Sequence, residues 1–149
     1  MCRILLLLLL SAPFIGFAQI QDPVKWTFTA KKISEGKYQF HLTAAIQKGW
    51  HIYSQATPEG GPTATNVEFN KNPLVVMDGS VKEVGKMEQH FEKLFDVEVK
   101  QFSNKVDFVQ SVVIKNNVKT SVTGLVQYMV CNDKQCLPPK EIKFSIFIK

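Results

Sequence analysis

Arginine is nearly absent from this sequence, since Arg3 is the only arginine among 18 basic residues and lysine supplies the others. The lysines are spread along the chain, and no basic cluster with interleaved aromatic residues is present. A protein that binds nucleic acid usually carries such a cluster on one face. The formal net charge of +5 is therefore interpreted as a solvated surface, and a nucleic-acid partner is not expected.

Long apolar runs are also scarce, and the one present lies at the start of the chain, over residues 4–17. It follows a short basic start, and Gly16 and Ala18 place small residues at the positions that a signal peptidase reads. We predict a signal peptide over residues 1–18; an uncleaved membrane anchor is the alternative, for which the run is short. The remaining residues 19–149 are expected to form one domain with its own core and no membrane span.

Cysteine is rare as well, because Cys2 belongs to the predicted signal peptide and leaves only Cys131 and Cys136. Export places a protein where disulfides form, so these two cysteines are expected to pair with each other. A zinc site would need two further ligands, and the three histidines stand in unlike contexts: His41, His51 and His90. Neither a metal nor another cofactor is expected.

Apolar and polar residues alternate with a period of two along most of the chain, which indicates β-strands. The alternation is clearest over residues 24–30, 38–47, 106–114 and 142–148, and turn signals rich in Gly, Pro and Asn separate these runs. The arrangement predicts an all-β sandwich. Residues 84–95 show no clear period and are interpreted as a loop.

The two cysteines stand in the stretch VCNDKQCLPP, between predicted strands over residues 123–131 and 140–148. Facing residues of an antiparallel pair lie about 4.5–5.5 Å apart, which suits a disulfide at the tip of a hairpin. So short a ring contributes only about 2 kcal/mol in the chain-entropy model. Pro138 and Pro139 cannot donate to a sheet and should keep the second cysteine accessible. A redox pair fits these features, but from the spacing alone a structural disulfide stays equally open.

The segment CNDKQCLPP resembles the active-site hairpin of the N-terminal periplasmic domain of the thiol:disulfide interchange protein DsbD. The resemblance extends to the stretch KGWHIY at residues 48–53, to residues 61–69, and to residues 84–102, which are similar to a cap loop and the strand after it. It implies an immunoglobulin-like β-sandwich with the two cysteines on a hairpin tip. This chain departs from the family in having four residues between the cysteines, one fewer than usual. Leu137 stands where the family has an aromatic residue, and His51 replaces one tyrosine.

The resemblance also implies roles for residues. Cys136 would form the mixed disulfide with partners, and Cys131 would resolve it. A cap-loop aromatic would shield the pair, with Phe95 as the best match and Phe91 as the alternative. The expected lining of the site is Tyr53, His51, Leu137 and Pro138.

At the level of the whole protein, the resemblance implies a periplasmic domain that passes electrons from a membrane electron carrier to thioredoxin-like proteins, disulfide isomerases or cytochrome c maturation factors. Because the sequence ends without a membrane or thioredoxin-like domain, we expect a free-standing, monomeric version that serves as one component of a relay. Whether it counts as an enzyme by itself stays open. The alternative is a secreted immunoglobulin-like adhesion or binding module whose hairpin disulfide is purely structural.

Overall fold

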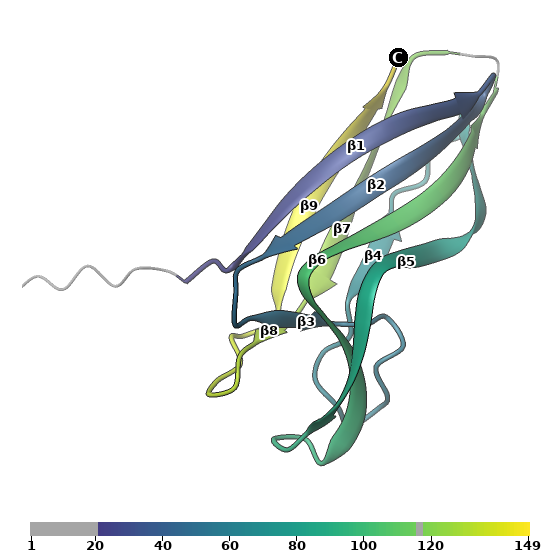
Figure 1. Ribbon diagram of the computed structural model, residues 1–149. Coiled ribbons are helices and arrows are strands. Elements are labelled where there is room, and N and C mark those ends of the chain that lie inside the picture. The colour runs from purple at the N-terminus through teal and green to yellow at the C-terminus, as the bar shows by residue number, and fades with distance from the viewer. Residues whose placement is uncertain (1–20, 116–117) are drawn as a thin grey trace, which may run out of the picture.

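The computed structural model describes residues 21–115 and 118–149, which form two β-sheets packed face to face (Figure 1). The predicted signal peptide lies outside the described residues. The larger sheet has six strands in the order β1-β2-β6-β3-β8, with β5 paired to β6, and the smaller sheet has the order β4-β7-β9. The strands are β1 (Val24–Ser34), β2 (Lys37–Ile46), β3 (His51–Tyr53), β4 (Asn66–Phe69), β5 (Val75–Glu92), β6 (Val97–Ile114), β7 (Thr120–Tyr128), β8 (Val130–Cys131) and β9 (Lys140–Ile148). The predicted all-β sandwich is confirmed.

The core lies between the two sheets and follows from the alternation in the sequence. Phe40 and Leu42 of β2 and Phe108 of β6 point inward from the larger sheet, and all three are fully buried. Val126 of β7 and Ile146 of β9 meet them from the smaller sheet. Burying one such apolar side chain contributes about 1.5–3 kcal/mol, so this interior sets the stability of the domain independently of the disulfide.

The segment predicted as a loop over residues 84–95 is mostly strand, so that prediction was wrong. Residues 84–92 belong to β5, which pairs with β6 almost to the tip of a long hairpin, and residues 93–96 form the turn. Polar residues occupy both faces here because the hairpin extends beyond the sandwich, as Figure 1 shows. The backbone ladder with β6, rather than burial of one face, defines this strand.

The predicted strand over residues 123–131 is divided in two. β7 ends at Tyr128 and pairs with β9, whereas β8 leaves the smaller sheet and pairs with β3 of the larger one. The alternation of side chains continues through Met129, so the change of sheet leaves no trace in the sequence pattern. As a result, Cys131 lies at the edge of the six-stranded sheet and not on a direct continuation of the β7–β9 hairpin.

Candidate redox site

A disulfide joins Cys131 and Cys136, as the sequence predicts, with an S–S distance of 2.02 Å and Cα atoms 4.0 Å apart. The loop between them is tightly bonded: the Asn132 side-chain oxygen accepts hydrogen bonds from the backbone N–H groups of Lys134 and Gln135, both at 2.9 Å. The two sulfurs have different environments. Cys131 is fully buried, whereas Cys136 is only partly buried, so solvent thiols can approach the disulfide from the side of Cys136 alone.

The pairing of β3 with β8 brings two predicted site residues to the disulfide. His51 stands directly opposite Cys131 in the antiparallel register. Tyr53 follows two residues later on the same face of the strand. Tyr53, Cys131 and Val99 form a small buried cluster that is separate from the main core. The floor of the site is therefore made by the shortest strands of the sheet, β3 and β8.

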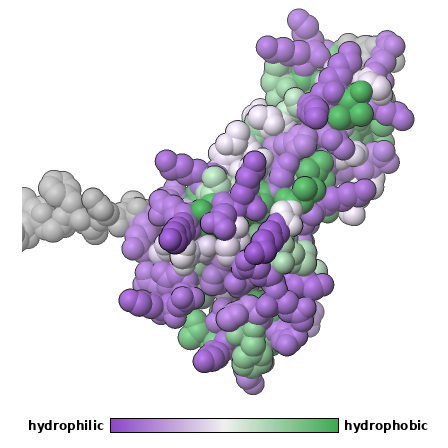
Figure 2. Space-filling model, viewed as in Figure 1, coloured by the Kyte–Doolittle hydropathy of each residue, from purple (hydrophilic) through white to green (hydrophobic). Residues whose placement is uncertain are grey.

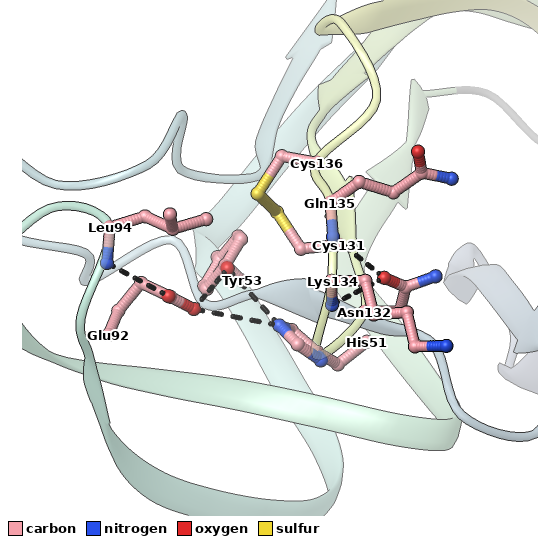
Figure 3. Close-up of a disulfide and its surroundings, with 9 residues drawn as sticks. All are labelled: His51, Tyr53, Glu92, Leu94, Cys131, Asn132, Lys134, Gln135 and Cys136. Carbon is pink, nitrogen blue, oxygen red and sulfur yellow. Dashed lines mark hydrogen bonds and ion pairs between the residues drawn. A yellow bond between two sulfur atoms is a disulfide. The ribbon is translucent and has the colours of Figure 1, made fainter.

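A hydrogen-bonded network connects this floor to the tip of the β5–β6 hairpin. The Tyr53 hydroxyl donates to Glu92 Oε2 at 2.9 Å, and His51 Nε2 lies 3.1 Å from the same hydroxyl (Figure 3). His51 Nε2 is also 3.9 Å from Glu92 Oε2. Since the Tyr53 proton is directed to Glu92, the hydroxyl oxygen accepts from His51 Nε2, which assigns the proton of the neutral ring to Nε2. Glu92 was not identified from the sequence, because a lone glutamate in an aperiodic segment carries no distinguishing signal.

Burial shifts the proton equilibria of this network. Desolvation, together with the hydrogen bond and charge of Glu92, raises the pKa of Tyr53 far above its ordinary value, so the phenol stays neutral. Desolvation lowers the pKa of His51, and the attraction of Glu92 only partly opposes this effect. His51 is therefore neutral at neutral pH, and Glu92 receives hydrogen bonds from uncharged donors.

The hairpin tip carries Leu94 as well as the two residues that were predicted to cap the disulfide, Phe91 and Phe95. In the view of Figure 3 the Leu94 side chain is directed toward the disulfide from the same side as Glu92, and it is 67% exposed. Phe91 precedes Glu92 and so lies on the opposite face of β5, where it is 47% exposed. Phe95 is partly buried within the turn, where its backbone N–H donates to the Glu92 carbonyl at 3.1 Å. A capping role for either phenylalanine stays a prediction.

The remaining predicted lining residues lie on the other side of the cysteine loop. Leu137 and Pro138 border a hollow of about 290 Å³ that also touches Tyr128, with an ion pair between Lys140 and Asp22 at 2.9 Å nearby. A second hollow of about 390 Å³ separates the hairpin tip from the cysteine loop. It is lined by His51, His90, Glu92, Lys93, Leu94, Asn132, Asp133 and Lys134. The cysteine loop thus contributes Asn132, Asp133 and Lys134 to one hollow, and Leu137 and Pro138, which follow it, line the other.

Metal chemistry has no candidate site in the part of the chain that the structure describes, where no group of three or more His, Cys, Asp or Glu side chains could hold a metal ion. Within the same residues, no helix has the length and apolar character needed to cross a membrane.

The model of one protein family, described as the N-terminal region of the thiol:disulfide interchange protein DsbD, matches residues 18–148. The chain belongs to the DsbD N-terminal family. A comparison with curated protein sequences gives no match. Among solved structures, the reduced DsbD N-terminal domain of Neisseria meningitidis is similar with a TM-score of 0.54 and 14% identity, over 82% of this chain and 84% of that one. The N-terminal periplasmic domain of ScsB from Proteus mirabilis has a TM-score of 0.53 and 14% identity, over 82% of this chain and 44% of that one.

These comparisons confirm the immunoglobulin-like fold and the resemblance on which the site was predicted. The DsbD N-terminal family takes its name from a thiol:disulfide interchange protein. In this chain, a disulfide joins the two cysteines of the predicted hairpin. Sequence identities of 14% support the fold but assign no role to a single residue. The roles must therefore be argued from the geometry of this chain.

Proposed function

We propose that this domain carries out thiol–disulfide exchange in the periplasm through Cys131 and Cys136. Electrons arrive from a membrane-linked thiol donor and leave to thioredoxin-like or isomerase partners. The observation that carries the proposal is the unequal burial of the two sulfurs, with Cys131 enclosed and Cys136 accessible. The family supports the class of reaction, and the predicted signal peptide supports export to a compartment where disulfides form.

Unequal burial gives the two cysteines different roles in each exchange. A donor thiolate attacks Cys136 Sγ and forms a mixed disulfide, while the electron pair of the broken S–S bond passes to Cys131 Sγ, which takes up a proton. The second thiol of the donor, as a thiolate, then attacks the donor sulfur of the mixed disulfide and releases Cys136 as a thiolate. The donor leaves oxidised by two electrons, and the domain is left with both cysteines reduced.

The delivery of electrons follows the same steps in reverse. The Cys136 thiolate attacks an oxidised partner, and Cys131 then attacks Cys136 Sγ to restore the internal disulfide and release the reduced partner. Cys131 is well suited to this resolving step because it lies next to Cys136 and away from solvent. A buried thiol is protected from competing partners, so the mixed disulfide forms on one sulfur only.

The surface around Cys136 is compatible with a protein partner. Figure 2 shows a mostly hydrophilic face with several apolar areas, and some of these lie at the lower end, over the tip of the β5–β6 hairpin. Leu94 is exposed at this tip, and Phe91 is exposed on the opposite face of β5. Apolar side chains at a rim of charged ones are typical of surfaces that bind other proteins transiently.

The reduction potential of Cys131–Cys136 in the folded protein without its signal peptide tests the proposal. After equilibration in defined thiol buffers, free thiols are counted by mass following alkylation. A potential above about −270 mV would fall in the range of exchange proteins. A potential below about −300 mV, in a bond that is reduced only when the protein unfolds, would instead indicate a structural disulfide in a binding module.

Trapping of partners provides the matching positive experiment. Cys131→Ser leaves Cys136 free but removes the resolving thiol, so mixed disulfides should accumulate with thioredoxin-like proteins of the same compartment. Cys136→Ser is the control, because its remaining thiol is the buried one. Equal trapping by the two variants would contradict the assignment of Cys136 as the attacking cysteine.

A further inference from the structure

Segments from three parts of the chain meet at the end of the sandwich opposite the disulfide (Figure 1). The backbone N–H of Ile114, the last residue of β6, donates to the Gly36 carbonyl in the β1–β2 turn at 2.7 Å. The N–H of Lys115 donates to the Leu74 carbonyl at 2.9 Å, and the Asn72 side chain donates to the hydroxyl of the first residue of β7 at 3.0 Å. These bonds hold the β1–β2 turn, the loop over residues 70–74 and the adjoining ends of β6 and β7 in one surface.

Lysine side chains gather on this surface, which we call the basic end. Six of them are exposed here: Lys31, Lys32, Lys37, Lys71, Lys115 and Lys119. With two acidic residues, Glu35 and Asp78, the basic end has a formal charge of +4, out of +5 for the whole sequence. None of the ion pairs between described residues includes one of the six lysines. The even spread of lysine along the chain therefore hides a strong asymmetry of charge in space.

The same three segments each carry an exposed apolar side chain. Ile33 is 51% exposed, Val118 is 38% exposed and Leu74 is 36% exposed. Ile33 lies in a bulge, because the pairing of β1 with β2 shifts register between Lys32 and Ser34. A bulge of this kind turns a side chain away from its regular direction. Figure 2 shows apolar areas with hydrophilic surroundings at this upper end of the molecule.

We propose that the basic end docks on the surface of an anionic lipid bilayer, where Ile33, Leu74 and Val118 insert between the head groups and the six lysines contact the phosphates. Basic residues close to an anionic bilayer gain binding free energy from its surface potential. Apolar side chains that enter the interface add to this free energy. The inference is independent of the proposed exchange function.

The composition of the basic end favours a lipid surface over an acidic protein. Surfaces that bind proteins are enriched in aromatic residues, Met and Arg, and they are depleted in Lys. The basic end instead combines lysine with aliphatic side chains, and the only arginine of the chain, Arg3, lies in the predicted signal peptide. Arginine pairs with a carboxylate in a fixed, forked geometry, whereas lysine is a point charge on a flexible stem. A flexible point charge suits a fluid array of phosphates.

Docking through the basic end would leave the redox site free for partners. The strands β3 and β8 and the β5–β6 hairpin lie at the other end of the sandwich in Figure 1. A docked molecule would therefore present Cys136 away from the bilayer, toward proteins in the same compartment.

Co-sedimentation with lipid vesicles tests the proposal. The protein is purified after export and its N-terminus is determined by mass, so that a form that retains the apolar run over residues 4–17 is excluded. We expect binding to vesicles of equal parts phosphatidylglycerol and phosphatidylcholine, and at least about tenfold weaker binding to phosphatidylcholine alone. An increase in salt from about 0.1 M to about 1 M should release most of the protein, because the Debye length falls from about 10 Å to about 3 Å.

The double variant Lys37→Gln/Lys119→Gln tests the assigned surface. One lysine close to an anionic bilayer contributes a factor of about five, so the affinity for the mixed vesicles should fall on the order of twentyfold. The matched control is Lys25→Gln/Lys105→Gln, which removes the same charge from exposed positions at the other end of the larger sheet, where both lysines pair with Ala45. The control should keep most of the affinity.

Ile33→Ser measures the apolar part of the interaction. Because Ile33 is half exposed, the fold should tolerate the change, and the affinity for the mixed vesicles should fall by about fivefold. Val84→Ser is the control, since Val84 is 58% exposed on β5 outside the basic end, and it should leave the affinity unchanged. Urea unfolding checks that both variants remain folded.

The rate at which dithiothreitol reduces the disulfide reports the orientation of the docked protein. We expect the same rate for free and vesicle-bound protein, because Cys136 faces away from the bilayer. Slower reduction of the bound protein would place the redox end against the lipid and would overturn the assigned surface.

Two further outcomes would overturn the docking surface and leave the exchange function in place. One is equal binding to neutral and anionic vesicles, or an equal loss in the two double variants. The other is binding to soluble poly-glutamate without binding to anionic vesicles, which would assign the basic end to an acidic protein partner. Failure of the exchange function would appear separately, in the reduction potential of Cys131–Cys136, which none of these variants alters.

Discussion

Gly124 shows how a single position without a side chain shapes the smaller sheet. In β7 it pairs with Phe69 of β4 on one side and with Phe144 of β9 on the other. The rings of these two phenylalanines meet edge to face, with centroids 5.5 Å apart. A Cβ atom at Gly124 would collide with the Glu68 carbonyl oxygen and would lie 2.5 Å from Phe144 Cζ. The close approach of the strands and the aromatic pair therefore both require glycine here.

Gly124→Ala should lower the free energy of unfolding by about 2 kcal/mol or more, since one of the colliding atoms belongs to the backbone and cannot move aside. Urea unfolding followed by tryptophan fluorescence measures the change. Ser145→Ala, on an exposed position of the neighbouring strand, is the control and should change the value by less than about 0.5 kcal/mol. Equal stability of the two variants would show that the sheet relaxes around the methyl group.

Among the strands, β6 contributes most to the position of the site residues, through its pairing with neighbouring strands on both edges. It pairs with β5 along its whole length, and on its other edge it pairs first with β3 and then with β2. Between these two partners Asn104 adopts a positive φ of 65°, opposite the register shift in β5. Asparagine tolerates this conformation better than most residues. Asn104 thus lies where β6 changes partner from β2 to β3, and the hairpin beyond it brings Glu92 to Tyr53.

Asn104→Val should destabilise the domain by about 1–2 kcal/mol, because a β-branched residue is strained at positive φ. Asn104 is exposed, so the loss cannot come from packing. Asn104→Gly is the control and should retain the original stability within about 0.5 kcal/mol, since glycine adopts this conformation freely. Urea unfolding gives both values. A similar loss in the two variants would indicate that the asparagine side chain, and not the backbone angle, is what matters.

The same elements show how far the sequence could predict this molecule. Strands with one buried face were recognisable, as in β2, where Phe40 and Leu42 alternate with polar residues. The outer half of β5 was not, because neither face is buried and its strand character depends on pairing with β6. The cysteine pair was predicted from the number of cysteines and the expected export, and the proximity of His51 and Tyr53 to it from the family resemblance. Glu92 and Leu94 were not predicted, since their position depends on the pairing of β5 with β6 beyond Asn104, which local pattern does not encode.

In the whole molecule, the site and the core occupy separate regions. Figure 1 shows β3, β8 and the hairpin arm together at one end of the sandwich, and the C-terminus at the other. The buried cluster at the disulfide contains Tyr53, Val99 and Cys131, and it is distinct from the core between the sheets. A local change in the contacts around the disulfide would therefore leave the core between the sheets in place. Such local change is characteristic of binding sites, which belong to the less stable parts of a fold.

The burial of neutral His51 also makes the stability of the whole domain depend on pH. Its pKa in the folded protein is lowered by desolvation below the ordinary value of 6.5. Above pH 6.5 the ring is neutral in both states and contributes no pH dependence. As the pH falls from 6.5 through the lowered pKa, the unfolded chain binds a proton that the folded protein does not, so the free energy of unfolding decreases.

Urea unfolding at pH 7.5 and pH 5, with the disulfide intact, should show a larger loss of stability in the unaltered protein than in His51→Gln. Glutamine cannot titrate but can still donate to the Tyr53 hydroxyl, so it isolates the proton from the hydrogen bond. Each unit by which the pKa is lowered adds about 1.4 kcal/mol to the difference. Identical losses in the two proteins would mean that the ring is protonated as easily in the folded state as in the unfolded one.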